Sequence, residues 1–149
     1  MYKVLYIIGG RYYSPIAMHL SDDAIVEYKL GEVSASPWGP IIAFEDLDNA
    51  RVFKESLKCH ADRMVIARVD GVIWNIGYPK YLLALGEGRS YTGLEIKEFW
   101  DHPEFWSEID NPLRVVRSDK TYKYFGYGNI PNGTIYCRWI RLAEILSNV

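Results

Sequence analysis

The chain has 149 residues, of which 49% are hydrophobic, and its 17 basic and 19 acidic side chains leave a net charge of −2. A chain of this length and composition buries enough apolar surface to fold without disulfide or metal staples. Proteins that bind nucleic acid usually carry a basic excess for contacts to phosphate, and this chain lacks one. The composition therefore favours one globular domain over residues 1–149 and argues against nucleic acid as a partner.

Cysteine content and hydropathy indicate a reducing compartment and no membrane segment. The two cysteines, Cys59 and Cys137, lie far apart in apolar surroundings. This is typical of buried thiols more than of a disulfide framework, with a single disulfide between the two as the alternative. No apolar run approaches the roughly 18 residues that a membrane-spanning helix needs, and the short apolar run near the N-terminus does not have the form of a signal peptide. We expect a cytoplasmic protein with no membrane contact.

Strand signals dominate the first 44 residues. Tyr2–Ile8 is rich in β-branched and aromatic residues and ends at a glycine pair, which predicts a first strand. A loop is expected over Arg11–Pro15. Ala24–Leu30 alternates weakly and predicts a second strand, and Ile41–Phe44 predicts a third after the turn-rich segment 34–40.

One amphipathic helix, over about residues 46–58, is the clearest element of the sequence. Asp46 or Asp48 is suited to cap its first turn. Apolar side chains recur at spacings of three and four, the periodicity of a helix that packs one face on a sheet. These apolar residues are Leu47, Ala50, Phe53 and Leu57.

A hairpin is expected after the helix. Met64–Val69 alternates as a strand, Asp70-Gly71 has the composition of a tight turn, and Val72–Ile76 follows as the partner strand. Tyr81–Leu85 is ambiguous between a helical turn and a strand. Glu95–Ile109 contains a His-Pro pair and predicts one or two short helices.

The last third of the chain predicts more strands. The segments 113–116 and 122–127 flank a polar turn as the arms of a hairpin would. Thr134–Ile140 alternates as a strand after a Pro-Asn-Gly turn, and Arg141–Leu146 is expected to form a short C-terminal helix. The whole chain predicts an α+β fold, mostly antiparallel sheet, with the clear helix packed on it.

Aromatic residues are the most unusual part of the composition, with 12 Tyr, 5 Trp and 5 Phe. Many of the tyrosines lie beside glycine, proline or charge, where a flat ring with a hydrogen-bonding edge favours contact with a partner. The predicted ligand-binding or partner-binding residues are Arg11, Tyr12, Tyr13, Trp38, Tyr78, Tyr124, Tyr127 and Arg138. For any one of these aromatic residues, a lid over the sheet ends is the competing interpretation.

Catalytic and metal motifs are scarce in the sequence. Cys59-His60 is the one adjacent pair of nucleophile and base, but neighbours on a helix point about 100° apart. The three histidines and two cysteines have none of the spacings typical of metal sites. The sequence predicts no metal and no cofactor.

A resemblance adds a biological setting. The order Tyr-Lys-Val in the first strand, Tyr-Ser-Pro at 13–15, Trp-Gly-Pro at 38–40 and the run Asp48–Phe53 resembles small uncharacterised proteins of phages, archaeal viruses and prokaryotes. The likeness covers about the first 60 residues and extends to the Pro-Asn-Gly-Thr segment and strand at 131–142. It implies a virus-encoded accessory protein and brings no settled activity.

One enzyme class is a competing hypothesis. Small ADP-ribosyltransferases place an Arg after the first strand, serines on a middle strand and a late Glu, and Arg11, Ser36 and Glu144 fit this order. Ser36, however, precedes a proline in a turn-rich segment, and the acidic pair expected on a strand is missing.

The function favoured by the sequence is therefore a non-catalytic binding protein. Its aromatic loops would bind a host protein or sequester a nucleotide-like small molecule, with rings stacking on a base and arginines on phosphate. The ADP-ribosyltransferase is the first alternative. A homo-oligomeric structural or interaction protein is the second, because the same aromatic surface suits a dimer interface.

Overall fold

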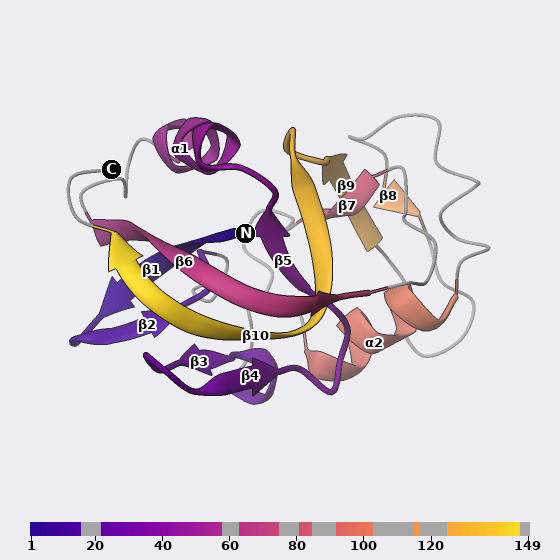
Figure 1. Ribbon diagram of the computed structural model, residues 1–149. Helices are drawn as coiled ribbons and strands as arrows, with labels where there is room; N and C mark the ends of the chain where they lie inside the picture. The colour runs from indigo at the N-terminus through magenta and orange to yellow at the C-terminus, as the bar shows by residue number, and fades with distance from the viewer. Residues whose placement is uncertain are drawn as a thin grey trace.

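The computed structural model describes residues 1–15, 22–57, 63–74, 81–84, 92–102, 115–116 and 125–146, with the backbone alone for 81–84, 115–116 and 125–129. These residues form a seven-stranded antiparallel sheet, a separate three-stranded sheet and two α-helices (Figure 1). The predicted α+β fold with a mostly antiparallel sheet is confirmed.

The first two strands form a tight hairpin. β1 (Tyr2–Ile8) and β2 (Arg11–Tyr13) are antiparallel and pair up to Ile8 and Arg11. The two intervening residues are Gly9 and Gly10, with φ of 57° and 78°. A two-residue turn with both φ positive suits the twist of paired strands, and glycine adopts it without strain. The loop predicted over Arg11–Pro15 is therefore wrong for its first three residues.

The large sheet continues with short strands and two long ones. Its other members are β3 (Glu27–Tyr28), β4 (Val33–Ala35), β5 (Ile41–Phe44), β6 (Met64–Ile73) and β10 (Thr134–Leu146). The predicted third strand is confirmed as β5. The second strand, expected over Ala24–Leu30, contains only β3, since Asp22–Ala24 forms a 3₁₀ turn.

Four of these strands pair in a closed ring. β1 pairs with β6, β6 with β10, and β10 with β5. A single pair, Tyr2 with Phe44, joins β5 back to β1 and closes the ring. Buried side chains on the inner face form the main core. They include Leu5, Ala67, Val69, Ile140 and Leu142.

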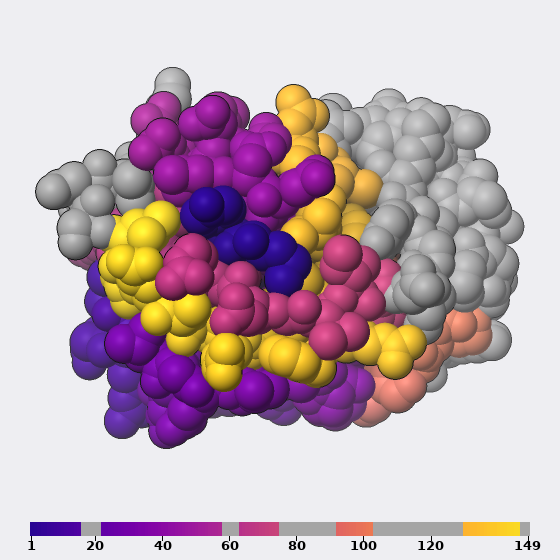
Figure 2. All heavy atoms as spheres, viewed as in Figure 1, coloured from indigo at the N-terminus to yellow at the C-terminus, as the bar shows by residue number. Residues whose placement is uncertain are grey.

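The helix α1 (Leu47–Ser56) covers the other face of β1 and β6. Asp46 caps it by accepting a hydrogen bond from the Asn49 backbone N–H at 2.8 Å. Ala50 is fully buried against Val4, Tyr6 and Ile66 in a second core. In Figure 2 the atoms of α1 lie above the N-terminal strand, with β6 and β10 as a band below. The predicted helix is confirmed to within two residues.

A smaller unit lies at the far end of the sheet in Figure 1. β7 (Tyr81–Ala84), β9 (Phe125–Asn129) and β8 (Val115–Val116) form the three-stranded sheet, in that order. The antiparallel pairing of β8 with β9 agrees with the two hairpin arms expected at 113–116 and 122–127, although β9 continues to Asn129, and residues 113–114 and 122–124 lie outside the described part. The ambiguous segment at 81–85 is a strand in its described residues.

The helix α2 (Gly93–Asp101) contacts the 3₁₀ turn at Asp22–Ala24, where the Gly93 backbone N–H donates a hydrogen bond of 3.1 Å to the Asp23 carboxylate. Thr92 and Glu95 form a capping box at its start. The Trp100 ring meets the Tyr136 ring of β10 edge-on at 5.3 Å, which ties the helix to the large sheet. The helix expected within 95–109 is α2, and residues 103–109 lie outside the described part. Among the described helices, none combines the length and hydropathy that a membrane crossing requires.

The end of the chain corrects a further expectation. Arg141–Leu146, predicted as a helix, continues β10 and pairs with β6. The register shifts twice, between Cys137 and Trp139 and between Leu142 and Glu144. Each shift inserts an extra residue, so the buried positions lose the strict alternation by which a strand is recognised.

The expected hairpin turn at Asp70-Gly71 is also wrong, because β6 runs through both residues. Asp70 pairs with Arg141, and Gly71 pairs with Ile140. A β-carbon on Gly71 would lie 2.6 Å from the Trp139 carbonyl oxygen, which belongs to the facing backbone and cannot move aside. The glycine therefore permits close approach of two strands and does not mark a turn.

This close approach predicts that Gly71→Ala is destabilising. Overpacking against backbone typically costs 1–3 kcal/mol, so we expect the free energy of unfolding to fall by about 2 kcal/mol in urea titrations. Ser34→Ala, in the strand that pairs with Ile140 from the other side, is the control and should change stability by less than about 0.5 kcal/mol. Equal stability of Gly71→Ala and wild type would contradict the packing described.

Candidate functional site

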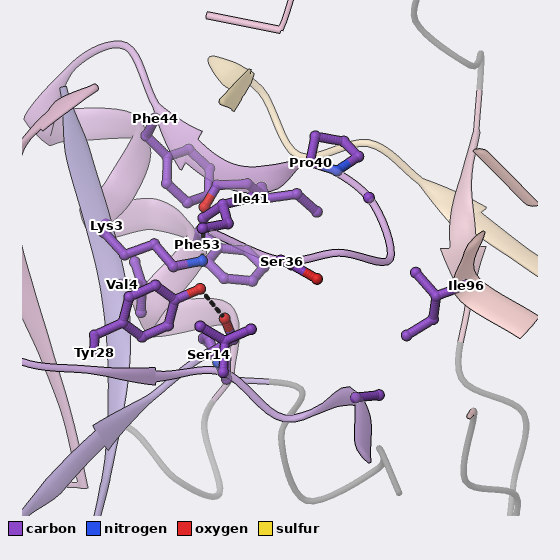
Figure 3. A pocket seen from close by; sticks show the side chains of 15 residues that line it. Lys3, Val4, Ser14, Tyr28, Ser36, Pro40, Ile41, Phe44, Phe53 and Ile96 are labelled. Atoms are coloured by element: carbon purple, nitrogen blue, oxygen red, sulfur yellow. Dashed lines mark hydrogen bonds between the residues drawn. The ribbon is translucent and has the colours of Figure 1, made fainter. Parts of the chain in front are cut away.

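A cavity of about 130 Å³ is lined by residues of β1, β3 and β5, by Phe53 of α1 and by Ile96 of α2. Figure 3 shows its lining from close by. Most of the wall is apolar, and the polar groups come from a few residues. The apolar wall includes Val26, Ile41, Phe44, Phe53 and Ile96, and the polar lining side chains are Lys3, Ser14, Tyr28 and Ser36.

Lys3 is the unusual residue of this cavity. It lies on β1 two residues before Leu5, so strand alternation directs it toward the core. Only 5% of its surface is exposed. Its Nζ donates a hydrogen bond of 2.7 Å to the Ile42 carbonyl oxygen and lies 5.5 Å from the centre of the Tyr28 ring. A carbonyl and an aromatic face thus partly replace the water that the amine loses.

Within the described residues, no carboxylate forms an ion pair with Lys3. Burial lowers its pKa to about 8, and a weaker interaction with Cys137 acts in the opposite direction. A lysine ammonium has three N–H donors, and the described contacts use one of them in a hydrogen bond. A buried cation whose N–H donors are not all used is stabilised by an anionic or hydrogen-bond-accepting group beside it.

A pair of hydroxyl groups completes the polar end of the cavity. The Tyr28 hydroxyl and Ser14 Oγ are 3.0 Å apart and form a hydrogen bond. Burial raises the pKa of Tyr28 to about 12, so its hydroxyl keeps its proton at neutral pH. In Figure 3 the Lys3 nitrogen and both hydroxyls point toward the same space. The site therefore offers one cation and two hydroxyls facing apolar walls.

The pattern of the first strand carries a signal for Lys3. In the segment YKVLYII, Lys3 occupies the same face as Leu5 and Ile7. A charged residue on the buried face of an otherwise apolar strand is costly unless a partner compensates it. Tyr28 could not be recognised in this way, because its place beside Lys3 depends on the pairing of β2 with β3.

The residues predicted for ligand or partner contact are spread over the molecule. Arg11 is exposed at the β1–β2 hairpin and forms an ion pair of 3.8 Å with Glu27. Tyr12 and Tyr13 are half-buried on β2, and Tyr12 packs on the main core. Arg138 is exposed on β10. Arg11, Tyr12 and Tyr13 are thus neighbours on β2, and no described contact joins them to Arg138.

Trp38 serves a structural role in its described contacts. Its indole Nε1 donates a hydrogen bond of 2.9 Å to the Asp23 carbonyl oxygen. The ring lies so close to Gly93 that a β-carbon there would overlap it. Tyr78 and Tyr124 lie outside the described residues, and Tyr127 is described only as a backbone position of β9. The aromatic contact surface stays a prediction.

The residues proposed for ADP-ribosyl transfer are not gathered into one site. Ser36 follows the residue that pairs with Trp139, whereas Glu144 lies several residues farther along β10. At about 3.3 Å per residue this separates them by roughly 15–20 Å. The Glu144 carboxylate instead accepts a hydrogen bond from Arg68 Nε at 3.3 Å. Of the three, only Ser36 lines the cavity.

Metal binding finds no support in the part of the chain that the structure describes, where no group of three or more His, Cys, Asp or Glu side chains could hold an ion. Cys137 is a free buried thiol on β10, and burial raises its pKa. The Cys59-His60 pair lies outside the described residues.

Comparison with known proteins adds no relative: no family model, no curated protein and no solved structure matches this chain.

The buried amine predicts a specific dependence of stability on pH. The pKa of Lys3 is about 8 in the folded protein and 10.5 in its ordinary state. Between these values the unfolded chain binds more protons than the folded one, so stability rises with pH. Relative to Lys3→Met, wild type should gain about 2 kcal/mol of unfolding free energy between pH 7 and 10.

Urea unfolding at several pH values measures this difference. Tyr28 and Cys137 also titrate in the alkaline range, but they are present in both proteins, and the subtraction removes most of their effect. Lys29→Met removes an exposed lysine and should preserve the rise seen in wild type. If the difference in unfolding free energy between wild type and Lys3→Met does not change with pH, Lys3 is not a desolvated amine in the folded protein.

Proposed function

We propose that this protein is a non-catalytic binding protein for a small, mostly apolar acid, whose carboxylate binds the Lys3 ammonium. The observation that carries the proposal is the buried cation at the cavity, which forms no ion pair among the described residues. A bound carboxylate would supply a counter-charge to this ammonium. Charge-assisted hydrogen bonds of this kind are about twice as strong as neutral ones.

The size and wall of the cavity support a ligand of limited dimensions. An apolar cavity of about 150 Å³ holds a benzene molecule, so this one of about 130 Å³ takes at most a single ring or a short alkyl chain, with the acid group at its polar end. Phe53 and Ile41 offer the apolar surface against which a ring or short alkyl chain would pack. Benzoate, with one ring and one carboxylate, has the matching chemistry. A whole nucleotide is larger and more polar than this cavity favours.

The hydroxyls give the site its orientation. The Tyr28 hydroxyl retains its proton and can donate to a carboxylate oxygen, while Ser14 holds the Tyr28 hydroxyl in place at 3.0 Å. The second carboxylate oxygen faces Lys3. The resemblance to viral proteins suggests the setting: a virus-encoded accessory protein that sequesters a small acid of the host cell.

Isothermal titration with benzoate tests the proposal. We expect saturable binding to one site, weakened at least about tenfold in Lys3→Met, because a hydrogen bond to a charged group contributes 1.5–3 kcal/mol. Lys29→Met is the matched control and should bind as wild type does. Benzyl alcohol, which has the ring without the charge, should bind at least about tenfold more weakly than benzoate.

The pH profile gives an independent check. Benzoate stays ionised throughout the neutral and alkaline range, whereas the Lys3 ammonium loses its proton around its pKa of about 8. Affinity should therefore fall by about tenfold or more between pH 7 and 9.5 in wild type. If benzoate binds equally well to wild type and Lys3→Met, or fails to bind at all, the proposal is wrong.

A further inference from the structure

We propose that Lys3 also captures small aldehydes covalently, as an imine formed in the same cavity. This inference rests on the ligand cavity of the proposed function and adds a reaction to it. It names a second class of ligand, carbonyl compounds with a compact apolar group. The geometry on which it depends is an amine, a hydroxyl donor and an apolar wall facing one space (Figure 3).

The amine is placed as a nucleophile needs to be. Its hydrogen bond to the Ile42 carbonyl oxygen fixes the end of a side chain that is otherwise flexible. This hydrogen bond uses one N–H of the neutral amine, so the second N–H and the lone pair of Nζ are available to a ligand. An aldehyde with its ring against Phe53 and Ile41 would present its carbonyl carbon to Nζ. Holding two reactants in such a geometry lowers the barrier to bond formation.

The protonation states of the site support the reaction. The nucleophile must be the neutral amine, and because the pKa of Lys3 is about 8, roughly a tenth to a third of the molecules carry it at pH 7–7.7. Desolvation in an apolar pocket is an established way to activate a lysine for imine formation. The titratable groups that face Lys3 in the described residues are Tyr28 on β3 and Cys137 on β10.

The chemistry balances without an oxidant or reductant. The Lys3 nitrogen forms a bond to the carbonyl carbon, and the carbonyl oxygen takes up a proton, which gives a carbinolamine. The C–O bond then breaks as a C=N bond forms. The oxygen leaves with both protons of the neutral amine as one water molecule. The Tyr28 hydroxyl, which Ser14 orients, is placed to donate a hydrogen bond to the carbonyl oxygen in the first step.

Benzaldehyde with cyanoborohydride tests the inference, because the hydride converts an imine into a stable secondary amine. Wild-type protein is treated at pH 7.5 and digested, and fragment masses locate the benzyl groups. We expect the Lys3 side chain to react at least about tenfold faster than exposed Lys29, whose amine stays in water. The α-amine of Met1 is a second reactive amine, and the fragment masses separate it from Lys3.

Two further measurements make the result specific to the cavity. Benzoate should block the Lys3 adduct and leave the Met1 adduct unchanged. In Lys3→Arg the cation remains but its guanidinium cannot form an imine, so the adduct at position 3 should vanish while that at Met1 persists. Tyr28→Phe should slow the Lys3 adduct several-fold. If Lys3→Arg does not fold, the ability of benzoate to block the Lys3 adduct in wild type still tests whether the reaction takes place in the cavity.

The outcomes separate this inference from the proposed function. Benzoate binding without a fast Lys3 adduct overturns carbonyl capture alone. A fast Lys3 adduct without benzoate binding supports carbonyl capture and overturns acid binding. A Lys3 adduct no faster than that of Lys29, or one that excess bound benzoate fails to block, also overturns the inference.

Discussion

The ladder between β6 and β10 is the interaction on which the rest of the structure depends. It extends from Ile66 to Ile73 on one strand and from Cys137 to Leu146 on the other. β1 joins this ladder through β6, whereas β4 and β5 join it through β10. Because β10 pairs along both of its edges and bends at two register shifts, the strands return on themselves and close around one core.

The closed ring of strands places a lysine in the interior, where two groups compensate part of the cost of its burial. The inner face of β1 points into the enclosed space, and one of its positions is Lys3. The apolar core sets the low polarity of its surroundings, while Ile42 and Tyr28 compensate part of the cost. The same residues that stabilise the fold therefore produce a weakly basic amine at a cavity wall, and the proposed binding of acids and the proposed capture of aldehydes both depend on this amine.

The fold was predictable from the sequence where local pattern and final structure agree. Asp46 as a cap and Ala50 with Phe53 on one face identified α1, and Tyr2–Ile8 identified β1. The errors arose where tertiary contacts override local signals. Asp70-Gly71 has the composition of a turn, but Gly71 lies within a strand, where the nearby Trp139 carbonyl oxygen leaves no room for a β-carbon. The two register shifts of β10 interrupt the alternation of buried and exposed residues by which a strand is recognised. The site was missed for a related reason: Lys3, Tyr28 and Ser14 meet only through strand pairing.

The ring closed by Tyr2 and Phe44 has a consequence for how the protein reaches its native state. The pairs that build the cavity join residues far apart in the sequence, such as Leu5 with Val65 and Ile41 with Cys137. Long-range pairing of this kind slows folding, because chain entropy is lost before the contacts form. The cavity is complete only when these long-range pairs have formed. Until the ring closes, Lys3 is an ordinary basic lysine, and its weak basicity is a property of the finished fold.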